Sequence, residues 1–540
     1  MSEKIETTGE PLDSREKSEV LQSEYEYVNN GFFRNLFQRK TLARLREDAG
    51  EETNVLKRDL SAFDLTMVGI GAIIGTGIFV LSGHAAADSA GPAVIISFVI
   101  AAIASGFAAL SYSEMTCMIP VSGSAYTYSY ATMGEFLAWI IGWDLMVEYL
   151  FGAATVSTGW SSYVVKFLKT VGATVDERFT TAPVAFSEEK GFYTTGGIIN
   201  LPAIFIVAAL TIVLCAGIRQ SKIVNNVIVG IKVLVVILFI LAAAKSVNPD
   251  NWKPFVPENT TGNWREYGAS GIFAAAQTVF FAYIGFDAVS TAAQEARRPQ
   301  RDLPIGIIAS LLVCTVLYVL TSMIMTGVVP YPTYKRDPAP IATATMATGM
   351  KWLTIIVSLG AIAGLTSVML ILLLAQTRIF YTMAHDGMLP LMFARVNPRT
   401  RTPLMPTVIC GIITALLGAF LPVDVLGNMT SVGTLLAFIL VHIGIVILRF
   451  TQPDLPRKFK IPGPSYTWLF FPIVGSAISL TLIILADKAT IWRVFVWLGI
   501  GVIVYLAYSY RHSRLRNKEH DEKLRALDAQ ARGANFGGAH

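Results

Sequence analysis

Long apolar stretches, separated by short polar segments, dominate the chain from about residue 64 to residue 509. Most of them hold about 18 or more largely apolar residues, enough for a helix to cross about 30 Å of hydrocarbon. The pattern predicts twelve membrane spans, at about residues 64–83, 92–112, 134–165, 197–216, 223–245, 270–290, 303–328, 352–376, 405–422, 429–449, 466–486 and 491–509. We therefore expect an all-α polytopic membrane protein.

Glycine interrupts two of these spans near the middle. The first interruption surrounds Gly75-Thr76-Gly77 and the second surrounds Gly285, five spans later. Irregular backbone persists in a bilayer only where protein or a cavity covers its polar groups. Two broken helices at corresponding positions of two repeats are the best sequence indication of a transporter's binding site. Close helix packing through small residues is the alternative interpretation.

The first interruption offers both ends of a helix dipole. The half-helix after it begins with free N–H groups, which suit a carboxylate. The half-helix before it ends in free carbonyl groups, which suit an ammonium group. These carbonyls are expected near Gly71, Ile73 and Ile74, and the second interruption adds those of Phe281, Ala282 and Ile284. A zwitterion would fit this combination of ends.

Composition and charge agree with a membrane protein. Hydrophobic residues make up 53% of the 540 positions and charged residues only 15%, against about 25% charged residues in soluble domains. No apolar leader precedes the first span, so this span is expected to direct insertion. The net charge of +5 is spread over tails and loops and gives no indication of nucleic-acid binding.

Basic residues flank the apolar region on both sides. They are Lys40, Arg44, Arg46, Lys57 and Arg58 before the first span, and Arg511, Arg514, Arg516 and Lys518 after the last. By the positive-inside rule both ends are expected in the cytoplasm, which requires an even number of spans. The expected division is a cytoplasmic tail (1–60), a transmembrane domain (61–510) and a second cytoplasmic tail (511–540).

Enzyme chemistry has little support in the sequence. The four cysteines have no metal-site spacing, and only His442 lies inside an apolar span, where a hydrogen-bonded core role is the simplest interpretation. No metal or cofactor is expected. A channel or a nutrient receptor on the same scaffold is an alternative to a carrier. Flux measurements separate them, because only a carrier combines saturable flux with counterflow.

A series of short motifs follows in order along the chain. They are GTGIF (75–79), AGP (90–92), Glu114, PVSGSAY (120–126), GWDL (142–145) with Glu148-Tyr149, YIGFD (283–287), Glu295 with Arg297, and Arg378 with Asp386-Gly387. This set resembles the amino acid–polyamine–organocation superfamily, and within it bacterial members of the cationic amino acid transporter family. The similarity covers about residues 56–510. Ala293-Gln294 departs from the Gly-Glu that the family often has.

The resemblance implies a fold and a site. The fold would have two inverted five-helix repeats (about 64–245 and 270–449), with helices 1 and 6 broken, and two peripheral helices (about 466–509), working by alternating access. The substrate carboxylate would meet the N–H groups of Thr76 and Gly77. The α-amino group would meet the carbonyls of Ile73, Phe281, Ala282 and Ile284.

Lys232 lies in the middle of the fifth span, about nine residues or roughly 13 Å from the nearer end. A lysine cannot reach water over that distance, and intramembrane charges are functional candidates. Burial favours the neutral amine, so this group could gain and lose a proton. In proton-coupled members of the superfamily such a lysine replaces a sodium ion, here beside Gly71, Ile74, Thr366 and Ser367. A fixed structural ammonium group is the alternative.

Five acidic residues are further candidates. Asp144 and Glu148 share a helix face, and the resemblance places Glu148 near the substrate side chain; both could instead hold tyrosines and waters. Asp287 follows the second interruption and would orient it or a water. Glu114 and Glu295 lie near the cytoplasmic face and are interpreted as gate or loop-locking charges.

These observations predict a secondary active importer of L-amino acids in the cell membrane, coupled to protons. The aliphatic stretch near Ile371 and Leu372 would shorten the pocket and favour small or medium neutral amino acids. An arginine or lysine transporter and a sodium-coupled or uncoupled exchanger are the alternatives. A small accessory subunit and the oligomeric state are left open.

Overall fold

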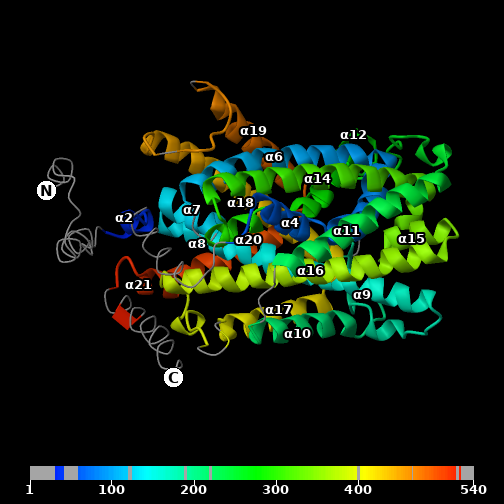
Figure 1. The fold of residues 1–540 in the computed structure, drawn as a ribbon, viewed down its shortest axis with the longest axis horizontal. Helices are drawn as coiled ribbons and strands as arrows, with labels where there is room; N and C mark the ends of the chain where they lie inside the picture. Colours follow the sequence, from blue (N-terminus) through cyan, green and yellow to red (C-terminus); the bar gives the residue numbers. More distant parts are fainter. Residues whose placement is uncertain are drawn as a thin grey trace.

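Apolar helices run side by side along the long axis of the molecule (Figure 1). The computed structural model describes residues 31–41, 59–119, 124–187, 191–217, 222–397, 400, 402–455, 457–464, 466–517 and 522–523. Residues 120–123 of the sequence motifs, Arg44, Arg46, Lys57, Arg58 and Lys518 lie outside these ranges.

The first half of the chain forms helices of very different length. They are α2 (Phe32–Leu36), α4 (Ala62–Ile73), η2 (Gly77–Leu81), α5 (Ser82–Ala85), η3 (Ala86–Ala90), η4 (Gly91–Ala93), α6 (Val94–Met118), α7 (Ser124–Thr132), α8 (Glu135–Met146), η5 (Val147–Phe151), α9 (Gly152–Thr170), η6 (Glu177–Phe179), α10 (Leu201–Cys215), α11 (Lys222–Ala243), η7 (Ala244–Ser246) and η8 (Pro249–Trp252). A short antiparallel hairpin, β1 (Val184–Ser187) and β2 (Gly191–Thr194), joins α9 to α10 with Val184 opposite Thr194.

The second half has the longer helices. They are α12 (Gly268–Val279), η9 (Phe280–Tyr283), α13 (Ala288–Thr291), η10 (Ala293–Glu295), α14 (Pro299–Val328), η11 (Tyr331–Tyr334), α15 (Pro340–Ala347), α16 (Lys351–His385), η12 (Leu391–Phe393), α17 (Leu404–Phe420), α18 (Val423–Thr451), η13 (Thr467–Leu469), α19 (Phe470–Ile484), α20 (Lys488–Val504), η14 (Tyr505–Ser509) and α21 (Tyr510–His512). Helices α2 and α21 lie at one end of the bundle and α15 at the other (Figure 1).

Many of these helices are suited to a membrane. Within the described ranges, nine segments are long and apolar enough to cross one: Gly77–Met118, Glu135–Thr170, Ile223–Ser246, Gly268–Thr291, Pro299–Val328, Lys351–His385, Val423–Thr451, Thr467–Ile484 and Lys488–His512. Three apolar helices are shorter: α4, α10 and α17. Helices α10 and α17 lie at the predicted fourth and ninth spans and are shorter than the apolar stretches suggested.

The first predicted interruption is a real break in a helix. Helix α4 ends at Ile73, Ile74 is extended (ψ 96°), and helical structure resumes at Thr76. Because the irregular residues are Ile74 and Gly75, the break lies slightly before the predicted Gly75-Thr76-Gly77 segment. The glycines mark the region, but the extended residue is the isoleucine before them.

The second predicted interruption is also broken, over a longer stretch. Helix α12 passes into the 3₁₀ turn η9, Ile284 is extended, and Gly285 has φ +108°, before α13 begins at Ala288. Only glycine adopts such a backbone conformation without strain. Packing places the two breaks beside each other, since η2 contacts η9 and α13 contacts α4.

Helix α20 is attached to α8 by three tryptophans. The indole rings of Trp139, Trp143 and Trp497 stack with centroids 5.6 and 4.7 Å apart. Trp143 donates a hydrogen bond from Nε1 to the carbonyl of Trp497 (2.8 Å), and Trp497 donates one to the carbonyl of Trp143 (3.1 Å). The last long helix is therefore fixed to the bundle by polar contacts as well as by apolar packing.

Candidate functional site

The two breaks touch through backbone. A Cβ atom at Gly77 would lie 2.2 Å from the Cα of Ala282, and one at Gly285 would lie 3.0 Å from the Cβ of Ala72. Such distances leave no space for a side-chain carbon at Gly77. Glycine is required there for contact between the breaks.

Hydrogen-bond donors face the first break. Because helical structure resumes at Thr76, the N–H groups of Thr76 and Gly77 have no intrahelical acceptor. The Thr76 hydroxyl is buried, and in the described part of the chain it has no hydrogen-bond partner. Gly159 of α9 lies beside it, since a Cβ there would be 3.0 Å from Oγ1. These donors are available to an anionic group.

Carbonyl groups of both breaks converge on one tyrosine that sequence reasoning missed. The hydroxyl of Tyr318, in α14, lies 2.7 Å from the carbonyl oxygen of Ile73 and 2.9 Å from that of Ala282. A phenol has one hydrogen to donate, so it cannot satisfy both acceptors at once. The carbonyl of Phe281 accepts from the N–H of Ile284 (3.2 Å). Three of the four carbonyls expected to bind an amino group, those of Ile73, Phe281 and Ala282, thus lie in one buried region.

Lys232 reaches the first break from α11. Its ammonium group donates to the carbonyls of Gly71 (2.8 Å) and Ile74 (3.0 Å), and the residue is 1% exposed. A Cβ at Gly364 of α16 would be 3.1 Å from the Cγ of Lys232, so the glycine leaves room for the lysine stem. The negative end of the α4 dipole stabilises a cation at this place.

Thr366 and Ser367 are placed differently from the expectation. The Thr366 hydroxyl donates to the carbonyl of Ile362 (2.8 Å) and accepts from Nε1 of Trp160 (2.9 Å). The Ser367 hydroxyl donates to the carbonyl of Gly364 (2.9 Å). Hydroxyls within a helix often bond back to the preceding turn, and in this conformation neither of them contacts Lys232.

Three buried carboxyl groups lie together. Asp287 accepts from the hydroxyls of Tyr149 and Ser124 (3.3 Å for Ser124), and Glu148 in η5 lies beside Asp287 and Asp144. Each is 1% exposed, and among the residues that the structure describes none of them makes an ion pair. Charging all three without a counter-charge would be costly. Asp287 ties the second break to η5 and α7, and Glu148 keeps one carboxyl oxygen unpartnered.

The chain is similar in sequence to known membrane transporters. A sequence model of the amino acid permease family matches residues 60–506. A branched-chain amino acid permease of Bacillus subtilis is 47% identical over 482 residues, which cover 89% of this chain and 99% of that protein. A methylthioribose transporter of the same organism is 41% identical over 481 residues, with the same two coverages. The Arabidopsis thaliana vacuolar cationic amino acid transporter 4 is 35% identical over 420 residues (78% and 68%).

The chain belongs to the amino acid permease family. Its relatives are transporters rather than enzymes, and the apolar helices make it a multi-pass membrane protein. The family resemblance expected from the motifs is confirmed, and with it a role in amino acid transport.

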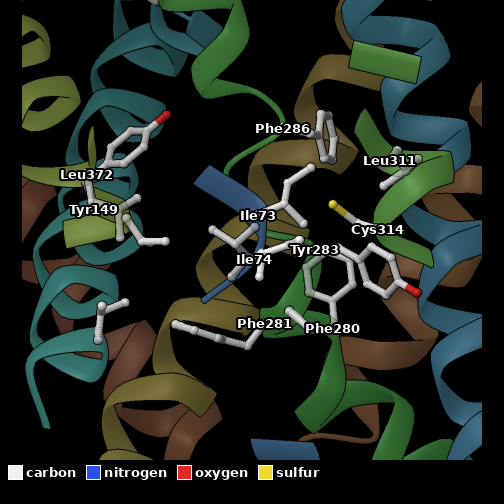
Figure 2. Packing of buried hydrophobic residues seen from close by; sticks show 14 of the residues in the cluster. Ile73, Ile74, Tyr149, Phe280, Phe281, Tyr283, Phe286, Leu311, Cys314 and Leu372 are labelled. Atoms are coloured by element: carbon white, nitrogen blue, oxygen red, sulfur yellow. The ribbon is translucent and has the colours of Figure 1, made fainter. Parts of the chain in front are cut away.

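Aliphatic, aromatic and cysteine side chains of the permease surround the first break (Figure 2). Figure 2 shows Ile73 and Ile74 between Tyr149 and Leu372 on one side and Tyr283 and Cys314 on the other. A Cβ at Gly152 would lie 3.6 Å from both Leu372 and Thr430 of α18, and one at Gly75 would lie 3.4 Å from Val368. Ile371 instead lies near Gly71 and the α11 side. Leu372, rather than Ile371, faces the carboxyl-bearing segment.

Charged contacts tie the permease together at the end where α2 lies. The backbone carbonyl of Glu295 accepts from the N–H groups of Asp59 (3.0 Å) and Leu60 (2.9 Å), and its side chain pairs with Arg378 (3.1 Å). Arg297 pairs with Asp59 (3.0 Å). The start of the first broken span, the end of the second and the end of α16 are therefore joined.

Glu114 lies deeper at the same end and is fully buried. Its carboxylate binds Arg449, pairs with Arg457 (3.3 Å) and accepts from the N–H of Ile461 (2.7 Å). These contacts hold the segment between α18 and α19 against α6. His442 is also fully buried, and its Nδ1 lies 2.8 Å from the hydroxyl of Ser111.

Proposed function

We propose that this permease is a secondary active transporter that imports L-amino acids together with protons by alternating access. Lys232 is the observation that carries the proposal: a buried ammonium group holds the carbonyls of Gly71 and Ile74, a few residues before the free N–H groups of Thr76 and Gly77. Loss of a proton from Lys232 would release the end of α4. A proton drives such a switch through its different affinity for the two conformations.

The amino acid would bind at the two breaks. Its carboxylate would take the N–H groups of Thr76 and Gly77 at the positive end of a helix dipole. Its α-amino group would take the carbonyls of Ile73, Phe281, Ala282 and Ile284. The proximity of Ile73 and Ala282 to a single hydroxyl supports a common binding position for one cation. Lys232, Gly71 and Ile74 would form the coupling site, with Thr366 and Ser367 joining it in another conformation.

We infer a twelve-span architecture from the same helices. Segment Gly77–Met118 contains the second half of one crossing and the whole of the next, and α4 completes the first. Adding α10 and α17 to the remaining segments gives twelve crossings. The breaks then fall in crossings one and six, as in inverted five-helix repeats of about residues 64–245 and 270–449, with α19 and α20 peripheral.

An even number of crossings puts tails 1–60 and 511–540 on one side of the transmembrane domain 61–510. The flanking basic residues favour the cytoplasm for that side, and the cell membrane as the location.

Neutral aliphatic amino acids are the proposed substrates. Leu372 and Val368 supply apolar surface near Gly152 and Gly75, and the most similar relatives named above include a branched-chain amino acid permease. A cationic amino acid is the second candidate, because Glu148, Asp144 and Asp287 carry three carboxyl groups without an ion pair in the described residues. Uncoupled exchange is the alternative to proton symport.

Uptake into proteoliposomes tests the proposal. Radiolabelled alanine, leucine, valine, arginine and lysine are supplied with and without an inward proton gradient, in the absence of sodium. Accumulation of a neutral amino acid only under the gradient is expected. Saturable uptake that ignores the gradient would leave amino acid transport in place and reject the coupling. Preference for arginine over every neutral amino acid would reverse the substrate ranking.

A further inference from the structure

A histidine near the α15 end of the bundle has an acceptor at each ring nitrogen. His84 of α5 places Nδ1 2.8 Å from a carboxylate oxygen of Asp424, at the start of α18. Its Nε2 lies 2.8 Å from the backbone carbonyl of Asp337, between η11 and α15. A neutral imidazole has a single N–H and could satisfy only one of these acceptors, whereas the imidazolium ion satisfies both. The geometry therefore fits a protonated ring.

Both acidic and basic side chains surround the histidine. Asp88 lies one turn further along the same helical stretch, and Lys335 and Arg336 of the segment before α15 lie near Asp88 and Asp424 respectively. Tyr334 of η11 donates to the carbonyl of Met325 (2.7 Å). The other segments packed on α5, which are η2, α12 and α15, carry no ionisable side chain.

The segment that presents the Asp337 carbonyl is held in a costly conformation. Arg336 has φ +58°, in the left-handed region that residues other than glycine rarely adopt. The carboxylate of Asp337 accepts from the N–H of Ala339 (3.0 Å), which fixes the turn. The carbonyl is thus kept toward His84 although the backbone alone would favour another arrangement.

A proton can reach this group from the surrounding medium. The side chain of Asp424 is 55% exposed, whereas that of His84 is 8% exposed. One partner therefore faces solvent and the other is covered. The exposed carboxylate of Asp424 can exchange a proton with the solvent and lies 2.8 Å from the histidine ring.

The first broken span and α18 meet along a buried seam, formed by Leu81, Thr155 and Gly427, and His84 lies beside it. One turn below His84, Leu81 lies 3.1 Å from the position of a Cβ at Gly427, and Thr155 of α9 lies 3.7 Å from that position. Leu81 is 1% and Thr155 0% exposed. The His84–Asp424 pair lies next to this buried layer, and His84 is farther than Leu81 from the first break along the same broken span.

We propose that His84 is a second proton-binding site, and that its protonation fastens α5 to α18 and to the Asp337 segment so that the outer path to the amino acid site is closed. The proton adds to the neutral imidazole and nothing leaves. This inference rests on the alternating access of the proposed function. It is separate from Lys232, which acts at the inner half of the same broken span.

A cysteine in the seam tests the proposal. Thr155→Cys is introduced with the four native cysteines retained, and the parent without it serves as blank. A membrane-impermeant thiol reagent is added outside. Thiol reactivity itself rises with pH, so labelling rates are compared between variants at the same pH.

His84→Gln in this background should label about fivefold faster than Thr155→Cys alone at about pH 6, the factor expected for losing one partly exposed ion pair. The ratio should fall toward one as the pH is raised far enough for His84 of the parent to lose its proton as well. Asp424→Asn should behave in the same way. His442→Gln, which changes a buried histidine away from the seam, should leave the ratio at one.

Equal labelling of Thr155→Cys with and without His84→Gln at acidic pH would overturn the proposal, and so would a ratio that does not change with pH. If His84→Gln fails to fold, Asp424→Asn serves as the second variant that tests the proposal. Because labelling requires no transport, pH-dependent labelling in a protein that moves no amino acid would reject the proposed function and leave the His84 site standing.

Discussion

Gly77 lies against Ala282 with no room for a side-chain carbon between them. The two broken spans consequently meet backbone to backbone, and this contact brings the N–H groups after the first break close to the carbonyls of the second. One residue without a side chain thus sets the geometry of both halves of the proposed site.

Gly77→Val should abolish transport. Overpacking of a core usually costs about 1–3 kcal/mol, and here the added carbon meets backbone that cannot rotate away. Uptake and substrate binding are measured in protein of normal yield. Gly106→Val is the matched control, because a Cβ at Gly106 meets nothing within 4 Å. Unchanged affinity in Gly77→Val would remove this contact from the binding site.

Lys232→Ala should lose accumulation driven by a proton gradient while retaining some substrate binding, because the ammonium on Gly71 and Ile74 would be gone. Lys232→Arg should fail as well, since a guanidinium does not deprotonate in proteins. Alanine uptake under an inward proton gradient is the measurement, and Lys245→Ala, at the exposed end of the same helical segment, is the control. Equal uphill uptake by the wild type and Lys232→Ala would show that coupling lies elsewhere.

Tyr318→Phe should weaken substrate binding by roughly 2- to 10-fold, the range for losing one hydrogen bond. The hydroxyl lies within hydrogen-bond distance of the carbonyls of Ile73 and Ala282 and donates to one of them at a time, so its loss leaves both without this donor. Tyr283→Phe is the matched control: its hydroxyl donates to the carbonyl of Phe98 (2.9 Å) in the same aromatic cluster. The apparent KM for alanine is compared, and a larger effect at Tyr283 would contradict the assignment.

Leu372→Ser should admit longer side chains than the wild type accepts. Leu372 and Thr430 face Gly152, whereas Ile371 lies toward α11, so Ile371→Ser should change the substrate range less. Competition of a series from alanine to arginine against labelled alanine gives the profile of each variant. If Ile371→Ser broadens the range and Leu372→Ser does not, the pocket lies on the other face of α16.

Glu114→Gln should lower thermal stability. Removing one partner of a buried charge cluster typically costs about 3–5 kcal/mol, and here Arg449 and the N–H of Ile461 would lose a charged acceptor. The melting temperature in detergent is the measurement. Glu177→Gln is the control, since Glu177 pairs with Lys169 at the surface and exposed pairs contribute little. Equal melting of Glu114→Gln and wild type would make this cluster dispensable.

The sequence predicted the general fold and part of the site for clear physical reasons. Apolar length indicated a multi-pass membrane protein, and glycine identified both breaks, although the extended residue of the first is Ile74. The mid-span position of Lys232 implied burial, and its partners Gly71 and Ile74 came from the family resemblance. Those contacts lie where the resemblance implied.

Other features depend on tertiary contacts that the sequence does not encode locally. Tyr318 is one tyrosine in an apolar helix, and buried tyrosines are common in cores; only its distance to two carbonyls distinguishes it. His84 and Asp424 are 340 positions apart. Thr366 and Ser367 depend on side-chain rotamers, which favour bonds to their own helix in this conformation.

The stacked indoles of Trp139, Trp143 and Trp497 have an optical consequence. Aromatic chromophores 4.7 to 5.6 Å apart in a fixed mutual orientation couple their electronic transitions, so this trio should dominate the near-ultraviolet circular dichroism of the folded chain. Trp139 and Trp143 both belong to α8, so the part of the signal that comes from Trp143 and Trp497 is the part that requires α20 to be seated on α8. The protein therefore carries an intrinsic spectroscopic label that reports, without any added probe, whether its last long helix has docked.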